Sequence, residues 1–159
     1  MTQLSEARAG VVTPEMKIVA EREGVDPQWL KDQVAVGRVV VPHNPSGGRA
    51  VPCGVGEGLF VKVNANIGTS SDRADLDEEL EKLNASIAAG TDTVMDLSTG
   101  GHISKTLETI LNASTVPVGT VPIYQAVVET VESEGGLINL SVDKIFEVIE
   151  KQASQGVDF

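Results

Sequence analysis

Residues 59–68 read LFVKVNANIG, and this stretch sets a design that two later stretches repeat. Alternation of side chains with a period of two residues predicts a β-strand that ends in a glycine. Because the flanking segments have the composition of buried core, the polar face of the strand needs hydrogen-bond partners, and a bound ligand could supply them. The apolar face carries Val61, Val63 and Ala65, and the polar face carries Lys62, Asn64 and Asn66.

The two later stretches are residues 93–97 (TVMDL) and 116–121 (VPVGTV), and a helical pattern separates each strand from the next. Each ends in a polar or glycine-rich turn. Asn66, Met95 and Tyr124 lie at matching places at or just past the three strand ends, 29 residues apart each time. A strand and helix that recur about every 30 residues are typical of the βα repeat of a parallel sheet.

Apolar residues at helical spacing predict a helix after each of these strands and one more helix near the end of the sequence. On the outer face of the first helix, Glu78 and Lys82 are four residues apart and are expected to form an ion pair. The first helix has an apolar stripe at Leu76, Leu80, Leu83 and Ile87, the second covers about residues 103–113, the third about 124–134, and the last begins at Ser141 and ends at Gly156.

The first fifty or so residues have a separate, mainly helical character. Thr13 and Asp26 each precede a proline, which is the pattern of an N-cap followed by proline at the first helical position. A short β-like run follows at residues 38–41 (RVVV). Residues 43–58 are then rich in glycine, proline and serine, as in an ordered loop. We place a domain boundary near residue 58.

Residues 157–159 (VDF) have the pattern of a fourth strand. A strand cut at its third residue would leave unpaired backbone groups, so we expect this sequence to be the N-terminal portion of a longer protein. Three to four βα units fit a (β/α)8 barrel, which needs eight. The predicted α/β architecture is a small, mainly helical N-terminal domain over residues 1–58, followed over residues 59–159 by the first part of a (β/α)8 TIM barrel, truncated at its fourth strand.

Charge limits the classes of partner. The formal charge is −11; residues 1–50 carry six basic and six acidic side chains, and the rest carries six basic and seventeen acidic ones. Such a surface repels nucleic-acid phosphates and anionic membranes, and 3% aromatic residues leave few stacking platforms for bases. We expect neither nucleic acid nor a membrane as partner. Without a secretory signal or a run of 18 apolar residues, the expected location is the cytoplasm.

Several residues have both a functional and a structural interpretation. Asp96, inside an apolar strand, is either an internal anchor or an active-site group, because a buried carboxylate needs partners. Residues 98–101 (STGG) could hold an anion at a helix start or form an ordinary capping turn. His43 and His102 are too far apart in sequence to form a recognisable ligand pair, and the single Cys53 excludes a cysteine-rich metal site within the chain. No metal ligand is therefore assigned.

Long motifs of this sequence closely resemble the phosphomethylpyrimidine synthase family of thiamine biosynthesis. The resemblance implies a radical enzyme, a carbon–carbon lyase, that uses S-adenosylmethionine, a [4Fe–4S] iron–sulfur cluster and zinc, with a (β/α)8 core behind a smaller N-terminal domain. It covers essentially the whole sequence. The motifs are residues 62–72 (KVNANIGTSSD), 92–101 (DTVMDLSTGG) and 116–126 (VPVGTVPIYQA), with TPEM, GRVVVP, GVGEGL and QGVDF in the same order as in the family.

The resemblance implies that the full-length enzyme rearranges 5-aminoimidazole ribotide into 4-amino-5-hydroxymethyl-2-methylpyrimidine phosphate. It also implies substrate contacts at Asn66, Met95 and Tyr124, the positions that the repeat had already marked; the catalytic residues stay unassigned. The zinc-binding histidines and the three cluster cysteines are expected beyond Phe159, so this chain alone should be inactive. For the full-length protein the resemblance suggests a homodimer.

Two alternatives remain open. The first is the paralogous 5-hydroxybenzimidazole synthase, which uses the same ribotide and cofactors to make a cobamide lower-ligand precursor. The second is a free-standing acidic α/β module that binds a small ligand or a protein without chemistry. Residues 101–105 (GHISK) and 43–53 (HNPSGGRAVPC) differ from the usual family pattern. The sequence does not choose between a pyrimidine and a benzimidazole product.

Overall fold

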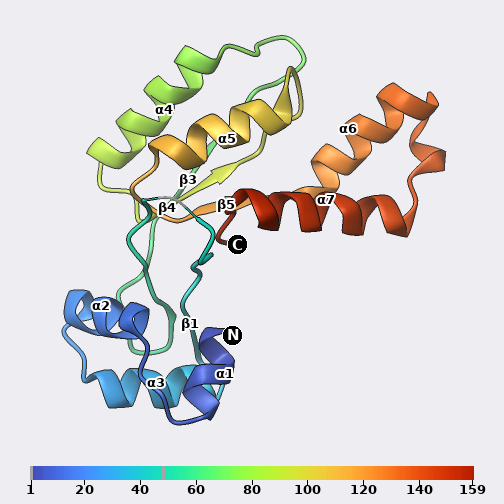
Figure 1. Cartoon of the computed structure of the whole chain (residues 1–159). Coiled ribbons are helices and arrows are strands. Elements are labelled where there is room, and N and C mark those ends of the chain that lie inside the picture. Colours follow the sequence, from blue (N-terminus) through green and yellow to red (C-terminus); the bar gives the residue numbers. More distant parts are fainter. Residues whose placement is uncertain (1, 48) are drawn as a thin grey trace.

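The computed structural model of the protein describes residues 2–47 and 49–159. Its helices are α1 (Gln3–Arg8), α2 (Pro14–Glu23), α3 (Pro27–Ala35), α4 (Leu76–Ala88), α5 (Ile103–Ala113), α6 (Pro122–Glu134), the 3-10 helix η1 (Leu137–Asn139) and α7 (Val142–Gln155) (Figure 1). Its strands are β1 (Val39–Val40), β2 (Val55–Gly56), β3 (Asn64–Ile67), β4 (Thr93–Asp96) and β5 (Val118–Thr120). The chain is therefore an α/β protein, as predicted.

The sheet that follows the N-terminal helices is parallel and has the order β3-β4-β5. One helix, α4, connects β3 to β4, and α5 connects β4 to β5, which confirms the βα repeat. Residues 157–159 run beside β5: the Asp158 amide donates to the Val118 carbonyl at 2.9 Å, and the Thr120 amide donates to the Phe159 carbonyl at 3.0 Å. These two backbone hydrogen bonds match the start of the predicted fourth strand. Closure into a (β/α)8 barrel stays a prediction.

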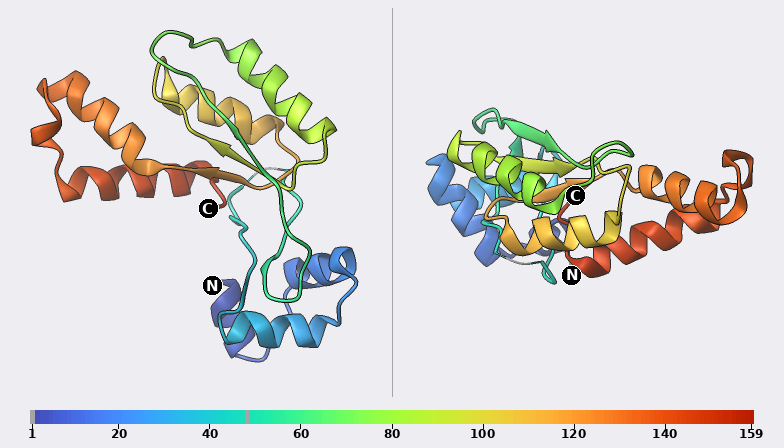
Figure 2. Two further views of the ribbon diagram at one scale, coloured as in Figure 1. Left: turned by 180° about the vertical axis from the view of Figure 1, so that it is seen from behind. Right: turned by 90° about the horizontal axis from the view of Figure 1, so that it is seen from above.

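Helices α4 and α5 cover one face of this sheet (Figures 1 and 2). Leucine and isoleucine side chains of the helices pack there against alternate residues of the strands. Each such side chain contributes about 1.5–3 kcal/mol when it is fully buried. The buried members of this sheet core are Ile67, Leu83, Val94, Leu107, Ile110, Leu111 and Val118.

A second core lies among the N-terminal helices. Thr13 and Asp26 accept hydrogen bonds from backbone amides at the starts of α2 and α3, and proline follows each, as predicted. The short β1 pairs antiparallel with β2. The buried members of this N-terminal core are Ala7, Met16, Val19, Ala20, Leu30, Val34, Val39 and Val41. The predicted boundary near residue 58 falls between the two cores along the sequence and stays a prediction.

The pair of helices α6 and α7 packs together and extends away from the β5 side of the sheet (Figures 1 and 2). Ser141 caps α7 as predicted, because its hydroxyl accepts from the Lys144 amide at 3.1 Å. Gly156 ends the helix with a positive φ of 104°. Among the described residues, no helix has the length and apolar character needed to cross a membrane.

Two expectations from the sequence are wrong in detail. The strand predicted over residues 59–68 is shorter and spans Asn64–Ile67; Lys62 precedes it and pairs with Glu23 of α2 at 2.8 Å. Val61 is consequently 94% exposed instead of packed. The expected pair of Glu78 with Lys82 does not form. Lys82 instead pairs with the buried Glu79 of α4. Glu78 pairs with Arg73 of the preceding loop.

Candidate substrate-binding site

The strand register places Asn66 directly beside Met95, and Met95 directly beside Gly119. Their neighbours Ile67 and Val94 belong to the core under α4 and α5. Because successive residues of a strand point to opposite faces, Asn66 and Met95 lie on the face that these helices do not cover. Asn66 is exposed and Met95 is half-buried. The structure thus brings two of the three predicted substrate contacts together at the carboxyl ends of the strands.

Asn66 is oriented by a short chain of hydrogen bonds along the same face. Thr93 donates its hydroxyl to Asn64 Oδ1 at 2.8 Å, and Asn64 Nδ2 donates to Asn66 Oδ1 at 2.9 Å. Within the described part of the chain, no hydrogen bond uses the Nδ2 group of Asn66. An oriented amide with unused donors at a strand end can recognise an acceptor atom of a ligand.

Tyr124 lies one element further along the chain. It occupies the first turn of α6, where its amide donates to the Val121 carbonyl at 2.9 Å, and it is 43% exposed. Its hydroxyl makes no hydrogen bond within residues 2–47 and 49–159. Helix α6 begins directly after β5, so Tyr124 shares the carboxyl end of the sheet with Asn66 and Met95. Within the described residues, no hydrogen bond joins Tyr124 to Asn66 or Met95.

The loop after β3 is held by a buried carboxylate that the sequence analysis did not single out. Glu79 of α4 is 2% exposed, and its Oε2 accepts from the Gly68 amide at 2.8 Å. Glu79 also pairs with Lys82. A signal was present in the sequence, because Glu79 is three residues after Leu76 and four before Leu83 and so lies beside the apolar stripe of the helix.

The loops after β3 and β4 are joined to each other. Thr69 donates its amide to the Ser98 hydroxyl at 3.0 Å and its own hydroxyl to the Gly100 carbonyl at 2.6 Å. In return, the Thr99 amide donates to the Thr69 carbonyl at 2.8 Å. Gly100 approaches so closely that a Cβ built on it would lie 2.2 Å from the Ser70 carbonyl carbon. Residues 98–101 therefore form a packed turn; anion binding there remains untested.

Asp96 is the anchor of this turn. Its Oδ1 accepts from the Ser98 amide at 2.9 Å and from the Ser98 hydroxyl at 2.5 Å. In the register it follows Met95 and therefore faces the helix-covered side of the sheet. Burial raises the pKa of the Asp96 carboxyl, and the two bonds from Ser98 oppose that rise. The structure thus supports the anchoring role of Asp96 and not an active-site role.

The expected metal cofactors have no ligand set among the described residues. Among the described residues, no group of three or more His, Cys, Asp or Glu side chains could hold a metal ion. Cys53 is buried, and burial raises the pKa of its thiol, which disfavours the thiolate that a metal needs. The residues present therefore do not fit a [4Fe–4S] cluster or a zinc ion, and no reaction step is assigned to them.

These features define a class: an α/β protein whose parallel sheet presents polar and thioether side chains at the carboxyl ends of its strands. The chain belongs to the Radical SAM ThiC family, whose family model matches residues 2–159. The family expected from the sequence motifs is thereby confirmed.

Among individual proteins, the chain is 52% identical to the phosphomethylpyrimidine synthase of Thermoanaerobacter pseudethanolicus and 49% identical to that of Thermus thermophilus. It is also 48% identical to 5-hydroxybenzimidazole synthase BzaB of Moorella thermoacetica. Each comparison includes 100% of this chain and 37% of the relative. The chain thus spans little more than a third of the length of the curated relatives that it matches.

Proposed function

We propose that this chain supplies the first substrate-contacting elements of a phosphomethylpyrimidine synthase. The whole enzyme would be a radical S-adenosylmethionine lyase that converts 5-aminoimidazole ribotide into 4-amino-5-hydroxymethyl-2-methylpyrimidine phosphate. Membership of the family and 52% identity to a named phosphomethylpyrimidine synthase support this proposal. The observation that carries it is the register that sets Asn66 beside Met95 at the strand ends.

The three side chains have complementary roles in this proposal. Asn66 offers amide donors to an acceptor atom of the ribotide. Met95 offers a polarisable thioether, which contacts flat aromatic rings favourably. Tyr124 offers a hydroxyl and a ring at the start of α6. Together they bind and orient the imidazole ribotide, and the reaction itself is assigned to groups outside this chain.

The cofactors of the whole enzyme are S-adenosylmethionine, a [4Fe–4S] cluster and zinc. Since a site-differentiated cluster takes several cysteine thiolates and this chain has one cysteine, its ligands would come from the remaining length of the relatives. The same holds for the zinc ligands. This chain alone would then bind substrate weakly and catalyse nothing, and the full-length protein would be a homodimer in the cytoplasm.

Calorimetric titration of the full-length protein with 5-aminoimidazole ribotide tests the site. We expect Asn66→Ala to weaken binding by about tenfold or more, because it removes hydrogen bonds to a polar ligand. Asn84→Ala is the matched control, since Asn84 is an exposed asparagine of α4 outside the strand ends. Equal affinities of the wild type and the Asn66→Ala variant would exclude Asn66 as a contact.

The second candidate function is 5-hydroxybenzimidazole synthesis, which the 48% identity to BzaB favours. The two proposals share a substrate and differ in product. Mass spectrometry of the products made by the reduced full-length enzyme from the ribotide and S-adenosylmethionine distinguishes them. The pyrimidine phosphate supports the first proposal, and 5-hydroxybenzimidazole replaces it with the second.

A further inference from the structure

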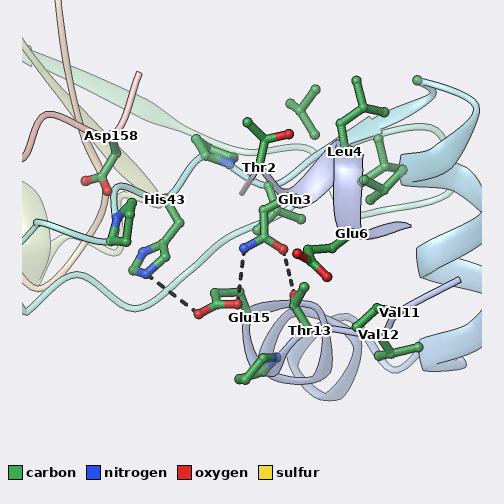
Figure 3. A pocket seen from close by; sticks show the side chains of 18 residues that line it. Thr2, Gln3, Leu4, Glu6, Val11, Val12, Thr13, Glu15, His43 and Asp158 are labelled. Atoms are coloured by element: carbon green, nitrogen blue, oxygen red, sulfur yellow. Dashed lines mark hydrogen bonds and ion pairs between the residues drawn. The ribbon is translucent and has the colours of Figure 1, made fainter. Parts of the chain in front are cut away.

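A groove of about 830 Å³ is lined mainly by residues of the N-terminal helical part. It runs between α1, the start of α2 and the extended stretch from Gly37 to Pro45, with Asp158 at one end (Figure 3). Its volume is within the range of about 300–1,000 Å³ that is usual for small-molecule sites. None of the three predicted substrate contacts lines it. The groove is thus a second concave surface that the proposed function does not use.

The walls of the groove are mainly apolar. The lining includes Val11 and Val12 from the loop before α2, and β1 with the residue that follows it. Several of these side chains remain accessible: Val11 is 45% exposed and Val40 is 58% exposed. An apolar surface that stays open to water favours an occupant with an apolar body. The apolar lining residues are Leu4, Val11, Val12, Val34, Val39, Val40 and Val41.

A connected group of polar side chains lies along one part of the groove. Gln3 donates its amide to Glu15 Oε2 at 3.1 Å, and the Thr13 hydroxyl donates to Gln3 Oε1 at 2.6 Å (Figure 3). His43 Nε2 is 3.9 Å from Glu15 Oε1, a distance too long for a hydrogen bond. Glu15 is thus oriented by Gln3 and retains capacity to accept from a further donor.

The charge of the lining is negative. Glu6, Glu15 and Asp158 line the groove, and no lysine or arginine does so among the described residues. Both Asp158 oxygens already accept from backbone amides at 2.9 Å, from Asn44 and from Val118, which leaves Glu6 and Glu15 to face an occupant. A hydrogen bond from its own backbone amide, helped by the side chains of Gln3 and Thr13, holds the pKa of Glu15 below its ordinary value. The carboxylate is therefore ionised at neutral pH.

One polar atom beside this group lacks a partner. His43 Nδ1 is buried and makes no hydrogen bond within residues 2–47 and 49–159. A buried polar atom without a partner is unfavourable, so such atoms are rare in folded proteins. Nε2 of the same ring is 3.9 Å from Glu15 Oε1, so an occupant that reaches Glu15 also lies beside the His43 ring.

We propose that this groove binds a small organic cation with an apolar body, such as an aromatic amidine or amine. The charged N–H group contacts Glu15 next to His43, and the apolar body lies against the valines of β1 and of residues 11–12. Charge complementarity distinguishes this occupant from a neutral or anionic molecule of the same shape. The proposal concerns a separate surface and does not depend on the ribotide reaction.

Three isosteric probes test the proposal: benzamidine, benzamide and benzoate are cationic, neutral and anionic versions of one shape. NMR titration of the 159-residue chain measures each affinity from amide shifts of residues that line the groove. We expect saturable benzamidine binding with a Kd on the order of millimolar, as is usual for so small a ligand. Benzamide should bind about tenfold more weakly, and benzoate should give no saturable shifts.

Matched variants locate the charge. Glu15→Gln keeps the acceptor for Gln3 and removes the charge, so it should weaken benzamidine about tenfold. Glu21→Gln makes the same change on the exposed side of α2, outside the groove, and should leave the affinity unchanged. If the Glu15 variant fails to fold, Val40→Lys provides the test. Val40 is an exposed lining residue that accommodates a lysine, and the added positive charge should weaken the binding of cationic benzamidine. Equal binding of benzamide and benzamidine, absence of saturable benzamidine binding, or unchanged affinity in Val40→Lys would each overturn the proposal.

Discussion

Asp96 and Glu129 illustrate how surroundings act on single carboxyl groups. Burial raises the pKa of Asp96, and the neighbouring hydroxyl and amide of Ser98 only partly oppose it. Burial also acts to raise the pKa of Glu129. There, however, hydrogen bonds and charge from Lys144, Gln125 and Lys151 prevail and lower it to about 2. The two groups should therefore give opposite dependences of stability on pH.

At Asp96 the folded state favours the protonated carboxyl. A raised folded pKa means that stability is fully present below the ordinary value of 3.8 and decreases as the pH rises through the folded pKa. In Asp96→Asn the side chain does not ionise, so the variant does not lose this stability as the pH rises, and its Oδ1 still accepts from Ser98. We expect the variant to gain stability relative to the wild type between about pH 4 and about pH 7. Urea unfolding at both pH values measures this difference; a relative gain in the opposite direction contradicts it.

At Glu129 the sign is reversed. The lowered folded pKa adds stability above the ordinary value of 4.5, and this stability is lost as the pH falls toward about 2. Glu129→Gln should therefore destabilise the protein at neutral pH, with a deficit that shrinks below about pH 4.5. Glu134→Gln, an exposed change on the same helix, is the control. A stability deficit of constant size from pH 7 to pH 3 in urea unfolding would contradict the lowered pKa of Glu129.

At the scale of elements, local sequence patterns predicted the helix starts and helix spans that depend on local interactions. The N-cap and proline pairs fixed the starts of α2 and α3, and the apolar spacing predicted α5 over the residues that the structure shows, Ile103–Ala113. Pairing of β1 with β2 was missed, because two-residue strands carry no periodicity and pair through distant residues. The shortening of β3 was missed as well, because the residues before it contact a distant part of the chain, as Lys62 does with Glu23, and no local pattern encodes such a contact.

The candidate site follows the same division. The 29-residue repeat placed Asn66 and Met95 at equivalent strand ends, and the register made them neighbours. Tyr124 follows the carboxyl end of β5, as the repeat predicted, although it belongs to helix α6. The loop anchor Glu79 was not found, because a glutamate on a helix is normally exposed and only tertiary packing shows that this one is buried.

The joined loops after β3 and β4 give a prediction at this scale. Gly100→Ala would place a Cβ 2.2 Å from the Ser70 carbonyl carbon, and backbone cannot yield as a flexible side chain does. We expect a loss of about 1–3 kcal/mol in unfolding free energy. Gly136→Ala is the matched control, since its Cβ would meet nothing closer than 3.9 Å. Similar stabilities of the two variants in urea unfolding would show that the loops are not closely joined.

At the scale of the whole molecule, two hydrophobic cores are connected by a few polar contacts. Glu23 of α2 pairs with Lys62 at 2.8 Å, and the two side chains are 7% and 9% exposed. The Phe60 amide also donates to Glu23 at 2.8 Å. On the other side, Asn44 donates its amide to Asp158 at 2.9 Å. These contacts join the helical part to the stretches that enter β3 and follow α7.

The buried pair should behave as a coupled unit. Lys62→Met leaves Glu23 buried without its counter-charge, which typically costs about 3–5 kcal/mol. The double variant with Glu23→Gln removes the stranded charge and keeps an acceptor for the Phe60 amide, so it should recover much of that loss. Unfolding free energies of the wild type, both single variants and the double variant form the test. Strictly additive losses would contradict coupling across this junction.

The contact between Gly119 and Phe159 has a consequence for how strands can join. A Cβ on Gly119 would lie 2.4 Å from the phenyl ring, so the aromatic side chain occupies room that only a residue without a side chain leaves. Sliding the terminal stretch by one position would present an aspartate carboxylate to that hollow in place of the ring. The fit of the ring over Gly119 thus selects one alignment of the terminal stretch, in addition to the hydrogen bonds that join it to β5.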